Sequence, residues 1–573
     1  MMLNSQITRQ KAPEMDSLHF GMGWSQQDVS APQVLVESTF GDSHPGSVHL
    51  LELAQNAVSG VAQAGGKASR YFVTDICDGM AQGHDGMNYS LASRDLICGM
   101  IEIHGRATTS DAGVFLSSCD KAVPAHLMAI GRLNLPGVVV TGGVMDAGPD
   151  LLTLEQIGTY YAQYKRGEID EDKLNYYKCH ACPSGGACSF MGTAGTMQVM
   201  AEALGLMLPG TALLPATSQE LREAAESAGR LAAALARSGR TPREMVTLKS
   251  FENAVAVHAA ISGSTNVVMH LPAIAHEFGI EMDAELFDRI HRTVPYLLNI
   301  RPSGYWPAQY FSYMGGVPAV MEEIKRHLHL DVMTVTGKTL GENLEELKTN
   351  GYYDRCAEKL AKAGVKKEDI LRPYGAPLGV QGSISILKGN LAPDGAVIKH
   401  AAVPQEMYNA LLTARPFDSE EEAIDAVLGD RIMPGDAVII RYEGPKGSGM
   451  PEMFYTTEAI ASNPALARSI ALITDGRFSG ASRGPVIGHV SPEAASGGAI
   501  ALVEEGDLIE LSIPERRLAV VGTKEGRKAP SEMEDILVQR RRRWSPLAPR
   551  FKHGVLKLFT ETAVSPMQGG YMK

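Results

Sequence analysis

The sequence predicts an α/β fold, with an N-terminal α/β domain built on a mostly parallel sheet and a C-terminal β-rich, barrel-like domain. Strand-like and helix-like segments alternate over the first 150 residues, whereas short β-rich runs dominate after about residue 382. A stretch rich in turn-forming residues, LRPYGAPLGVQGS, separates these two textures. We therefore predict an α/β domain over 1–385 and a barrel-like domain over 386–573.

The elements predicted for the first domain alternate between helix and strand. Residues 1–45 are of mixed character, and we expect an irregular lead-in there. Apolar residues at helical spacing predict helices, and short apolar runs predict buried strands. In chain order these are a helix over 49–64, a strand over 71–75, a helix over 95–104, a strand over 113–118, a helix over 123–133, a strand over 137–142, and helices over 221–236 and 337–347. This alternation is typical of a parallel sheet with helices on its faces.

The second domain is predicted from short β-rich runs that Gly, Pro and Asp turns separate. These runs cover 396–399, 436–441, 470–474, 498–503 and 508–513. Short strands that follow one another so closely are typical of a barrel-like domain.

Composition and charge narrow the class of protein. The chain has 573 residues, of which 44% are hydrophobic, and a net charge of −12 at pH 7. This balance argues against a nucleic-acid partner, because phosphate binding needs a basic surface, and the basic run 540–543 is read as a solvated helix face. No apolar stretch approaches the roughly 18 residues of a membrane span, and the N-terminus lacks the apolar core of a signal peptide. We expect a cytoplasmic protein with no membrane partner.

The most informative segment is Cys119-Asp120-Lys121. Soft thiolate ligands suit iron–sulfur clusters, and hard carboxylate ligands suit Mg²⁺. The seven cysteines of the chain are unevenly spaced and do not resemble a disulfide framework. In a reducing compartment, clustered cysteines more often indicate a metal site or catalysis. The segment therefore predicts a place where two different metals meet.

Four loops combine residues of this kind. Two of them, 74–79 and 118–121, each follow a predicted strand, a third covers 179–188, and the fourth joins 449–453 with 474–480. In an open α/β sheet, ligands bind at the carboxyl ends of the strands, which favours a functional role for the first two loops.

Taken one at a time, these residues have ordinary structural explanations. A cysteine after a strand is often a small buried thiol, and an aspartate or serine in a loop is often a turn or cap residue. Cys179, Cys182 and Cys188 also resemble a zinc or redox motif, although a clear second pair of ligands is missing. A non-catalytic protein with a structural zinc at these three cysteines is therefore one alternative.

Seven longer segments, which contain most of these residues, resemble a known protein family. They are CDGMAQGHDGMNYSLASRDLI (77–97), SCDKAVPAHLMA (118–129), GACSFMGTAGTMQVMAEALGLMLPG (186–210), FENAVAVHAAISGSTNVVMHLPAIA (251–275), GNLAPDGAVIKHAAV (389–403), VIIRYEGPKGSGMPEM (438–453) and ALITDGRFSGASRGPVIGHVSPEAASGGAI (471–500). In this order they resemble the dihydroxy-acid dehydratase and phosphogluconate dehydratase family over nearly the whole chain. The resemblance implies an α/β domain, a barrel-like domain, an active site between them, and a homodimer or homotetramer.

The resemblance also implies a magnesium site and a base. Asp78, Asp120 and Glu452 match the carboxylates that bind Mg²⁺. Lys121 matches a lysine that can be carbamylated to N6-carboxylysine and then bind Mg²⁺ through the carbamate. Ser479 matches the serine that acts as the catalytic base, which requires nearby cationic centres to stabilise its alkoxide.

The iron–sulfur site departs from the family pattern at one position. Cys119 and Cys188 match cluster cysteines, but Gly46 stands where many members have a third cysteine. Cys77 is the candidate for the third ligand, and a buried thiol beside the site is an equally good interpretation of it. The cluster type, 2Fe–2S or 4Fe–4S, stays open.

The expected reaction removes water from a 2,3-dihydroxy carboxylic acid and yields a 2-keto-3-deoxy acid. We favour a sugar acid such as xylonate, arabinonate or gluconate, because FGMGWS (20–25) and the segment 190–196 resemble xylonate-type dehydratases. Arg483, close to Ser479, is the candidate substrate-binding residue, although it could instead pair with a local carboxylate. The alternative is a dihydroxy-acid dehydratase of branched-chain amino-acid synthesis that acts on 2,3-dihydroxyisovalerate, a reading that YEGPKGSGMPEM favours.

Overall fold

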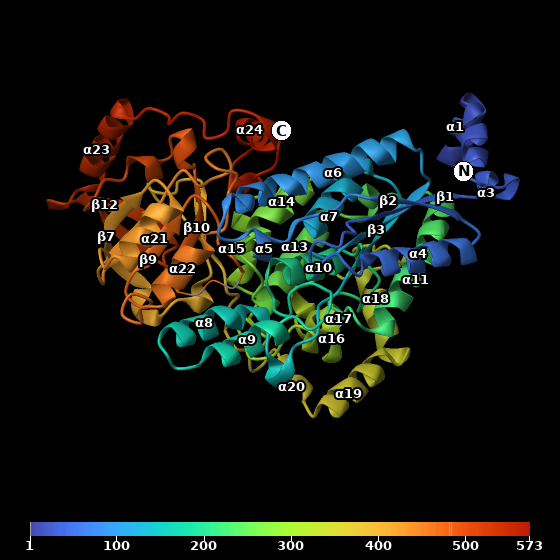
Figure 1. Cartoon of the computed structure of the whole chain (residues 1–573), viewed down its shortest axis with the longest axis horizontal. Helices are drawn as coiled ribbons and strands as arrows, with labels where there is room; N and C mark the ends of the chain where they lie inside the picture. The colour runs from blue at the N-terminus through green and yellow to red at the C-terminus, as the bar shows by residue number, and fades with distance from the viewer. Residues whose placement is uncertain (1, 481, 483) are drawn as a thin grey trace.

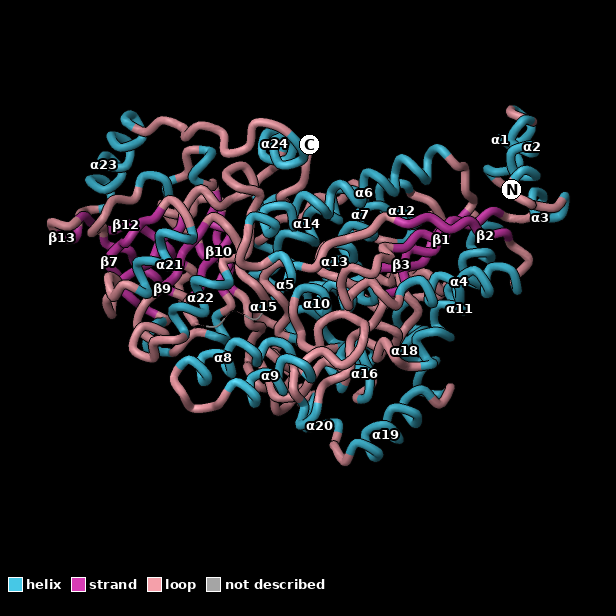
Figure 2. Tube along the Cα trace, in the orientation of Figure 1, coloured by secondary structure: helices cyan, strands magenta, loops and turns pink. Residues whose placement is uncertain are grey.

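The computed structural model describes residues 2–480, 482 and 484–573. Arg483, for which the sequence predicts substrate binding, lies outside these residues. Two sheets organise the chain: a small one in the N-terminal part and a larger one in the C-terminal part, at opposite ends of the molecule in Figures 1 and 2.

The first sheet is entirely parallel. Its strands are β1 (Gln33–Ser38), β2 (Lys67–Phe72), β3 (Ala112–Ser117) and β4 (Gly137–Thr141), in the order β2-β1-β3-β4. The predicted parallel sheet is confirmed, although the second strand begins and ends earlier than the predicted 71–75. All carboxyl ends of these strands point to the same edge, and this edge carries the first two loops.

Helices make up most of the first 370 residues. They are α1 (Asn4–Lys11), α2 (Glu14–Gly21), α3 (Gln26–Ser30), α4 (Leu50–Gln63), α5 (Asp78–Ala81), α6 (Tyr89–Ala107), α7 (Ala122–Leu133), α8 (Ile157–Lys165), α9 (Glu171–His180), α10 (Thr193–Ala203), α11 (Gln219–Ser238), α12 (Pro242–Met245), α13 (Leu248–Ile261), α14 (Val267–Phe278), α15 (Glu285–His291), α16 (Tyr310–Tyr313), α17 (Gly316–Glu323), α18 (Leu340–Thr349), α19 (Tyr352–Ala363) and α20 (Lys367–Ile370). The helices predicted at 49–64, 95–104, 123–133, 221–236 and 337–347 correspond to α4, α6, α7, α11 and α18, with ends that differ by a few residues.

The two faces of the first sheet are buried in different clusters. Val114 and Leu116 of β3 pack with α4 and α11, whereas Phe115, between them, packs with α7, α10, α13 and α14. Successive side chains of a strand point to opposite faces, so one strand contributes to both clusters. Burial on both faces explains why the strand sequences are continuously apolar.

The predicted irregular lead-in over 1–45 is wrong. Three helices form there, and β1 takes a central place in the sheet, between β2 and β3. Every residue of β1 is buried. Its sequence, QVLVES, has only three consecutive apolar residues, which is too short a run to separate a buried strand from other buried segments.

The second sheet has nine strands and mixed pairing. They are β5 (Ser385–Leu387), β6 (Gly395–Ile398), β7 (Asn409–Phe417), β8 (Asp436–Ile440), β9 (Ala471–Thr474), β10 (Val486–Ser491), β11 (Leu508–Ser512), β12 (Arg517–Thr523) and β13 (Gly526–Arg527), in the order β13-β12-β11-β7-β8-β9-β10-β6-β5. The sheet curls into a half-barrel, which confirms the barrel-like prediction (Figure 1). Its helices are α21 (Glu420–Leu428), α22 (Phe454–Ala461), α23 (Pro530–Arg543) and α24 (Gly554–Thr562).

One strand predicted for this part is wrong. Residues 499–502, inside the predicted run 498–503, form a single 3₁₀ turn with Ile500 fully buried. A short apolar run is compatible with either a strand or a buried helical turn. The tertiary packing of the run decides between them, and this packing cannot be read from the local sequence.

The C-terminus returns to the N-terminal part. Helix α24 lies beside α6 (Figure 1), where Leu556 and Phe559 pack with Leu91. The buried guanidinium of Arg94 donates hydrogen bonds to the carbonyls of Gly569 and Gly570, each at 3.0 Å. The last twenty residues thus join the two parts of the chain.

The hydropathy of the described helices gives one further result. Across residues 2–480, 482 and 484–573, no helix is long and apolar enough to cross a membrane.

Candidate active site

The first two loops meet at one edge of the parallel sheet. Asp78 begins α5 six residues after β2 ends, and Cys119, Asp120 and Lys121 lie between the end of β3 and the start of α7. Because β2 and β3 flank β1, their carboxyl ends are close in space. This topology brings the two loops together, as the sequence predicts.

Three carboxylates converge at this edge. One oxygen each of Asp78, Asp120 and Glu452 lies within 4.8 Å of the other two. Glu452 comes from the segment between β8 and α22, so the cluster joins the two parts of the chain. Asp78 and Glu452 are buried, with 4% and 5% of their surface exposed. These are the three residues that the family resemblance implies as Mg²⁺ carboxylates.

Two buried cations neutralise part of this charge. The ammonium of Lys121 donates a hydrogen bond to Asp78 at 2.7 Å, and the guanidinium of Arg477 lies 3.2 Å from the same carboxylate and also pairs with Glu452. Burial acts to raise the pKa of Asp78, but the charges of Lys121 and Arg477 outweigh it and lower this pKa to about 2. Asp78 is therefore ionised at neutral pH.

Asp120 differs from Asp78. Burial, together with the negative charge of Asp78, raises the pKa of Asp120 to about 8. A carboxylate cluster in which one member resists ionisation is short of positive charge, and a divalent cation would supply it. Carboxylate oxygens are also the ligands that Mg²⁺ prefers, so the donor set fits this ion.

Neutral groups orient the carboxylates. The hydroxyl of Ser90 donates to Asp78 at 2.8 Å, and the amides of Asn266 and Gln82 donate to Glu452 at 3.1 and 3.3 Å. The sequence alone assigns no role to these three residues or to Arg477. All four lie inside the segments that resemble the family, and this position is the signal in the sequence that points to them.

The same two loops bring two cysteines next to His44, which lies between β1 and α4. Ligand atoms of His44, Cys77 and Cys119 lie within 4.8 Å of one another. The hydrogen bond from Cys119 lowers the pKa of Cys77 to about 6, whereas the same hydrogen bond and burial raise that of Cys119. One thiolate beside one thiol is an environment that suits a soft metal centre.

Cys188 lies in the loop that leads into α10. Burial raises its pKa, and the negative charges of Cys77 and Asp120 add to that effect. Its ligand atom is outside the two convergent groups found among the described residues, as are those of Cys179 and Cys182. Cys179 is exposed on α9, and the zinc alternative at the three cysteines gains no support.

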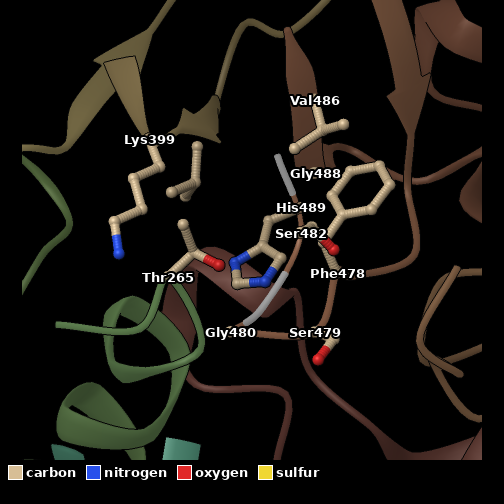
Figure 3. A pocket seen from close by; sticks show the side chains of 10 residues that line it. Thr265, Lys399, Phe478, Ser479, Gly480, Ser482, Val486, Gly488 and His489 are labelled. Atoms are coloured by element: carbon tan, nitrogen blue, oxygen red, sulfur yellow. The ribbon is translucent and has the colours of Figure 1, made fainter. Parts of the chain in front are cut away.

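A cavity beside these groups contains Ser479. Its lining includes the polar side chains of Thr265, Lys399, Ser482 and His489 and the apolar side chains of Val397, Phe478 and Val486 (Figure 3). Burial lowers the pKa of Lys399 to about 8 and that of His489 to about 3, so His489 is neutral at physiological pH.

Two stretches of chain connect this cavity with the carboxylates. Thr265 lines the cavity and the next residue, Asn266, binds Glu452. Asn266 also donates to Thr193 at 2.9 Å, five residues after Cys188. Ser479, on the cavity wall, follows Arg477 by two residues. The wall of the cavity is therefore built from the same segments that bind the carboxylates and lead from the cysteine loop.

Comparison with known families identifies the class of protein. Residues 31–343 match the model of the dihydroxy-acid/6-phosphogluconate dehydratase N-terminal region, and residues 369–570 match that of the C-terminal region. The chain belongs to this family and is a dehydratase.

Individual relatives cover nearly the whole chain. Dihydroxy-acid dehydratase 1 of Methanosarcina acetivorans is 44% identical over 89% of this chain and 90% of its own length. The dihydroxy-acid dehydratase of Methanothrix thermoacetophila is 42% identical over 100% of both chains, and that of Maridesulfovibrio salexigens is 42% identical over 98% of both. The family predicted from the sequence is confirmed.

Proposed function

We propose that this chain is a hydro-lyase acting on a short 2,3-dihydroxy carboxylic acid with an alkyl substituent, such as 2,3-dihydroxyisovalerate. The observation that carries the proposal is the convergence of Asp78, Asp120 and Glu452 next to a group of cysteines and the Ser479 cavity. The relatives named dihydroxy-acid dehydratase support this substrate better than the sugar acid favoured by our sequence analysis. Val397, Phe478 and Val486 give the cavity an apolar wall suited to an alkyl group.

The residues fit the metal groups that the family resemblance implies. Asp78, Asp120, Glu452 and Lys121, the last as a carbamate, are the proposed Mg²⁺ ligands. Cys119 and Cys188 are the proposed cluster ligands, with Cys77 the third candidate from the sequence. When bound, the iron–sulfur cluster and Mg²⁺ supply Lewis acidity toward the leaving hydroxyl and the substrate carboxylate.

The chain itself supplies binding and proton transfer. Ser479 is the proposed base that takes the proton from C2, and its position on the cavity wall supports this role. Lys399 lines the same cavity, and its ammonium donates to the carbonyl of Ser262 at 2.8 Å. Because it is charged below a pH of about 8, it attracts the substrate carboxylate. The surrounding burial excludes water and strengthens both interactions. The enol product then tautomerises to the 2-keto acid.

The experiment is an assay with 2,3-dihydroxyisovalerate, xylonate, arabinonate and gluconate, which detects 2-keto acid formation by anaerobically purified protein. We expect iron, acid-labile sulfide and turnover of 2,3-dihydroxyisovalerate with a kcat/KM well above that of the sugar acids. A higher value for a sugar acid would restore the sugar-acid reading, and a colourless protein holding one zinc would refute both.

The proposal also covers the domain boundary and the oligomeric state. We propose that the α/β domain ends at residue 385, and that the protein forms a homodimer or homotetramer, as the family resemblance implies. Sedimentation of the purified protein measures its oligomeric state directly.

A further inference from the structure

The surroundings of His44 point to a role that neither the sequence nor the family resemblance assigns to it. His44 is buried, with 5% of its surface exposed, and it lies two residues before Gly46. Its two ring nitrogens have different environments. Nε2 lies 2.9 Å from the carboxylate of Asp75 and 3.2 Å from the hydroxyl of Ser47, whereas Nδ1 is buried and has no hydrogen-bond partner.

This arrangement is that of a metal-binding histidine. Such a histidine donates the N–H of one nitrogen to a carboxylate or carbonyl, which fixes the tautomer and turns the lone pair of the other nitrogen toward the metal. Asp75 is itself buried, with 5% of its surface exposed, so it holds the ring firmly. A buried polar nitrogen without a partner is costly unless it finds a ligand.

An unpartnered ring nitrogen alone would carry little weight, because several other histidines, among them His49, His270 and His489, also have at least one. His44 differs in what lies next to it: it is the histidine whose ligand atom converges with those of Cys77 and Cys119 in the described part of the chain. Three potential ligands of a soft metal therefore surround one small space.

Gly46 leaves that space open. A Cβ atom at position 46 would lie 3.1 Å from Nδ1 of His44 and 3.2 Å from Sγ of Cys119. The nitrogen and the sulfur thus face the same volume, the one that a side chain at position 46 would fill. The missing third cysteine and the unpartnered nitrogen occupy the same place in the structure.

We propose that His44 is a ligand of the iron–sulfur cluster, binding through Nδ1 next to Cys119, so that the cluster has mixed cysteine and histidine ligation. Cys77 is then a hydrogen-bonding neighbour of Cys119 and is not required as the third ligand. This inference rests on the proposed function, because it needs an iron–sulfur cluster. A neutral imidazole in place of a thiolate raises the reduction potential of such a cluster.

The test is pulsed electron paramagnetic resonance of the one-electron-reduced protein, grown with ¹⁵N-labelled histidine. We expect a strong histidine nitrogen coupling in the natural chain, its retention in His49→Gln and Cys77→Ser, and its loss in His44→Ala. His49 is a matched control, because it is a half-buried histidine five residues further along the chain and its Nε2 bonds the carbonyl of Gly142 at 2.7 Å.

A second variant guards against a His44→Ala protein that fails to fold. In the double variant His44→Ala/Gly46→Cys, the alanine removes the nitrogen that would crowd the new Cβ, and the cysteine places sulfur in the same space. We expect unchanged iron and sulfide, no histidine coupling and a lower reduction potential.

The outcomes separate the two proposals. A cluster in the natural chain without histidine coupling, or with a coupling that survives in the double variant, overturns the ligation by His44 and leaves the proposed function standing. A natural chain that binds no iron and sulfide, or one zinc instead, overturns both.

Discussion

The guanidinium of Arg477 lies 3.2 Å from the carboxylate of Asp78, although 399 positions separate the two residues in the chain. Arg477 also donates to the hydroxyl of Ser90 at 2.9 Å and pairs with Glu452. One fully buried side chain from the half-barrel therefore fixes two carboxylates that come from different parts of the molecule. The carboxylate cluster depends on this contact for its shape.

Replacing Arg477 by methionine is expected to destabilise the protein. The change leaves Asp78 and Glu452 buried with less compensating charge, and breaking a buried ion pair from one side costs about 3–5 kcal/mol. The thermal unfolding midpoint in the presence of a metal chelator measures this loss. Arg468→Ala is the control, because Arg468 is 72% exposed in its pair with Glu406, and exposed pairs contribute roughly 0–1 kcal/mol. Equal midpoints for the two variants would contradict the role assigned to Arg477.

Replacing Ser479 by alanine tests the proposed base. General-base catalysis contributes about 10²- to 10⁴-fold, so we expect kcat to fall by that factor while iron and magnesium contents stay at the level of the natural chain. Ser462→Ala is the matched control, because Ser462 is exposed at the end of α22 and its hydroxyl donates to the carbonyl of Ala459, a local contact outside the site. Near-normal turnover by a Ser479→Ala protein that keeps its metals would remove Ser479 from the mechanism.

Lys399 gives a pH dependence with a definite sign. Burial lowers its pKa to about 8, so the side chain is charged below that pH and neutral above it, whereas the substrate carboxylate is ionised throughout. We therefore expect KM to rise as the pH increases through about 8. In Lys399→Met, KM should be high already at pH 7 and should change little with pH.

The control for this profile is Lys388→Met, a half-exposed lysine that pairs with Glu285. Its KM should follow that of the natural chain at every pH. If Lys399→Met retained the rise of KM near pH 8, another group would be responsible for it.

The part of the site that comes from the parallel sheet could be predicted, because it depends on local topology. Asp78 and Asp120 each follow a strand, and parallel neighbouring strands deliver such residues to one edge. Glu452 was found through the family segments and not through any local pattern.

The rest of the site depends on contacts that no local pattern encodes. Arg477 was quoted within a motif, but its pairing with Asp78 requires the two parts of the chain to be placed against each other. The sequence assigns no role to His44, since nothing in it indicates that Nδ1 of this residue faces Cys119. Similarly, the position of β1 in the sheet and the 3₁₀ turn at 499–502 are set by packing and not by periodicity.

The crossing of α4 and α11, which cover one face of the parallel sheet, gives a prediction about stability. The backbones approach so closely that a Cβ added at Gly229 would lie 2.0 Å from the carbonyl oxygen of Ala57, and one added at Gly60 would lie 1.8 Å from that of Glu226. Gly229→Ala must therefore push the two helices apart and disturb Leu53 and Leu221 in the cluster between them. Overpacking of this kind costs about 1–3 kcal/mol or more.

The same substitution at Gly99, in the interior of α6, provides the control. No atom lies within 4 Å of the Cβ that it would add, and alanine is favoured over glycine inside a helix by about 0.5–1 kcal/mol. Calorimetry should therefore show a lower unfolding temperature for Gly229→Ala and an equal or higher one for Gly99→Ala. Because only the surroundings of the added methyl group differ, a higher unfolding temperature in both variants would show that helix propensity, and not the contact between α4 and α11, determines the result.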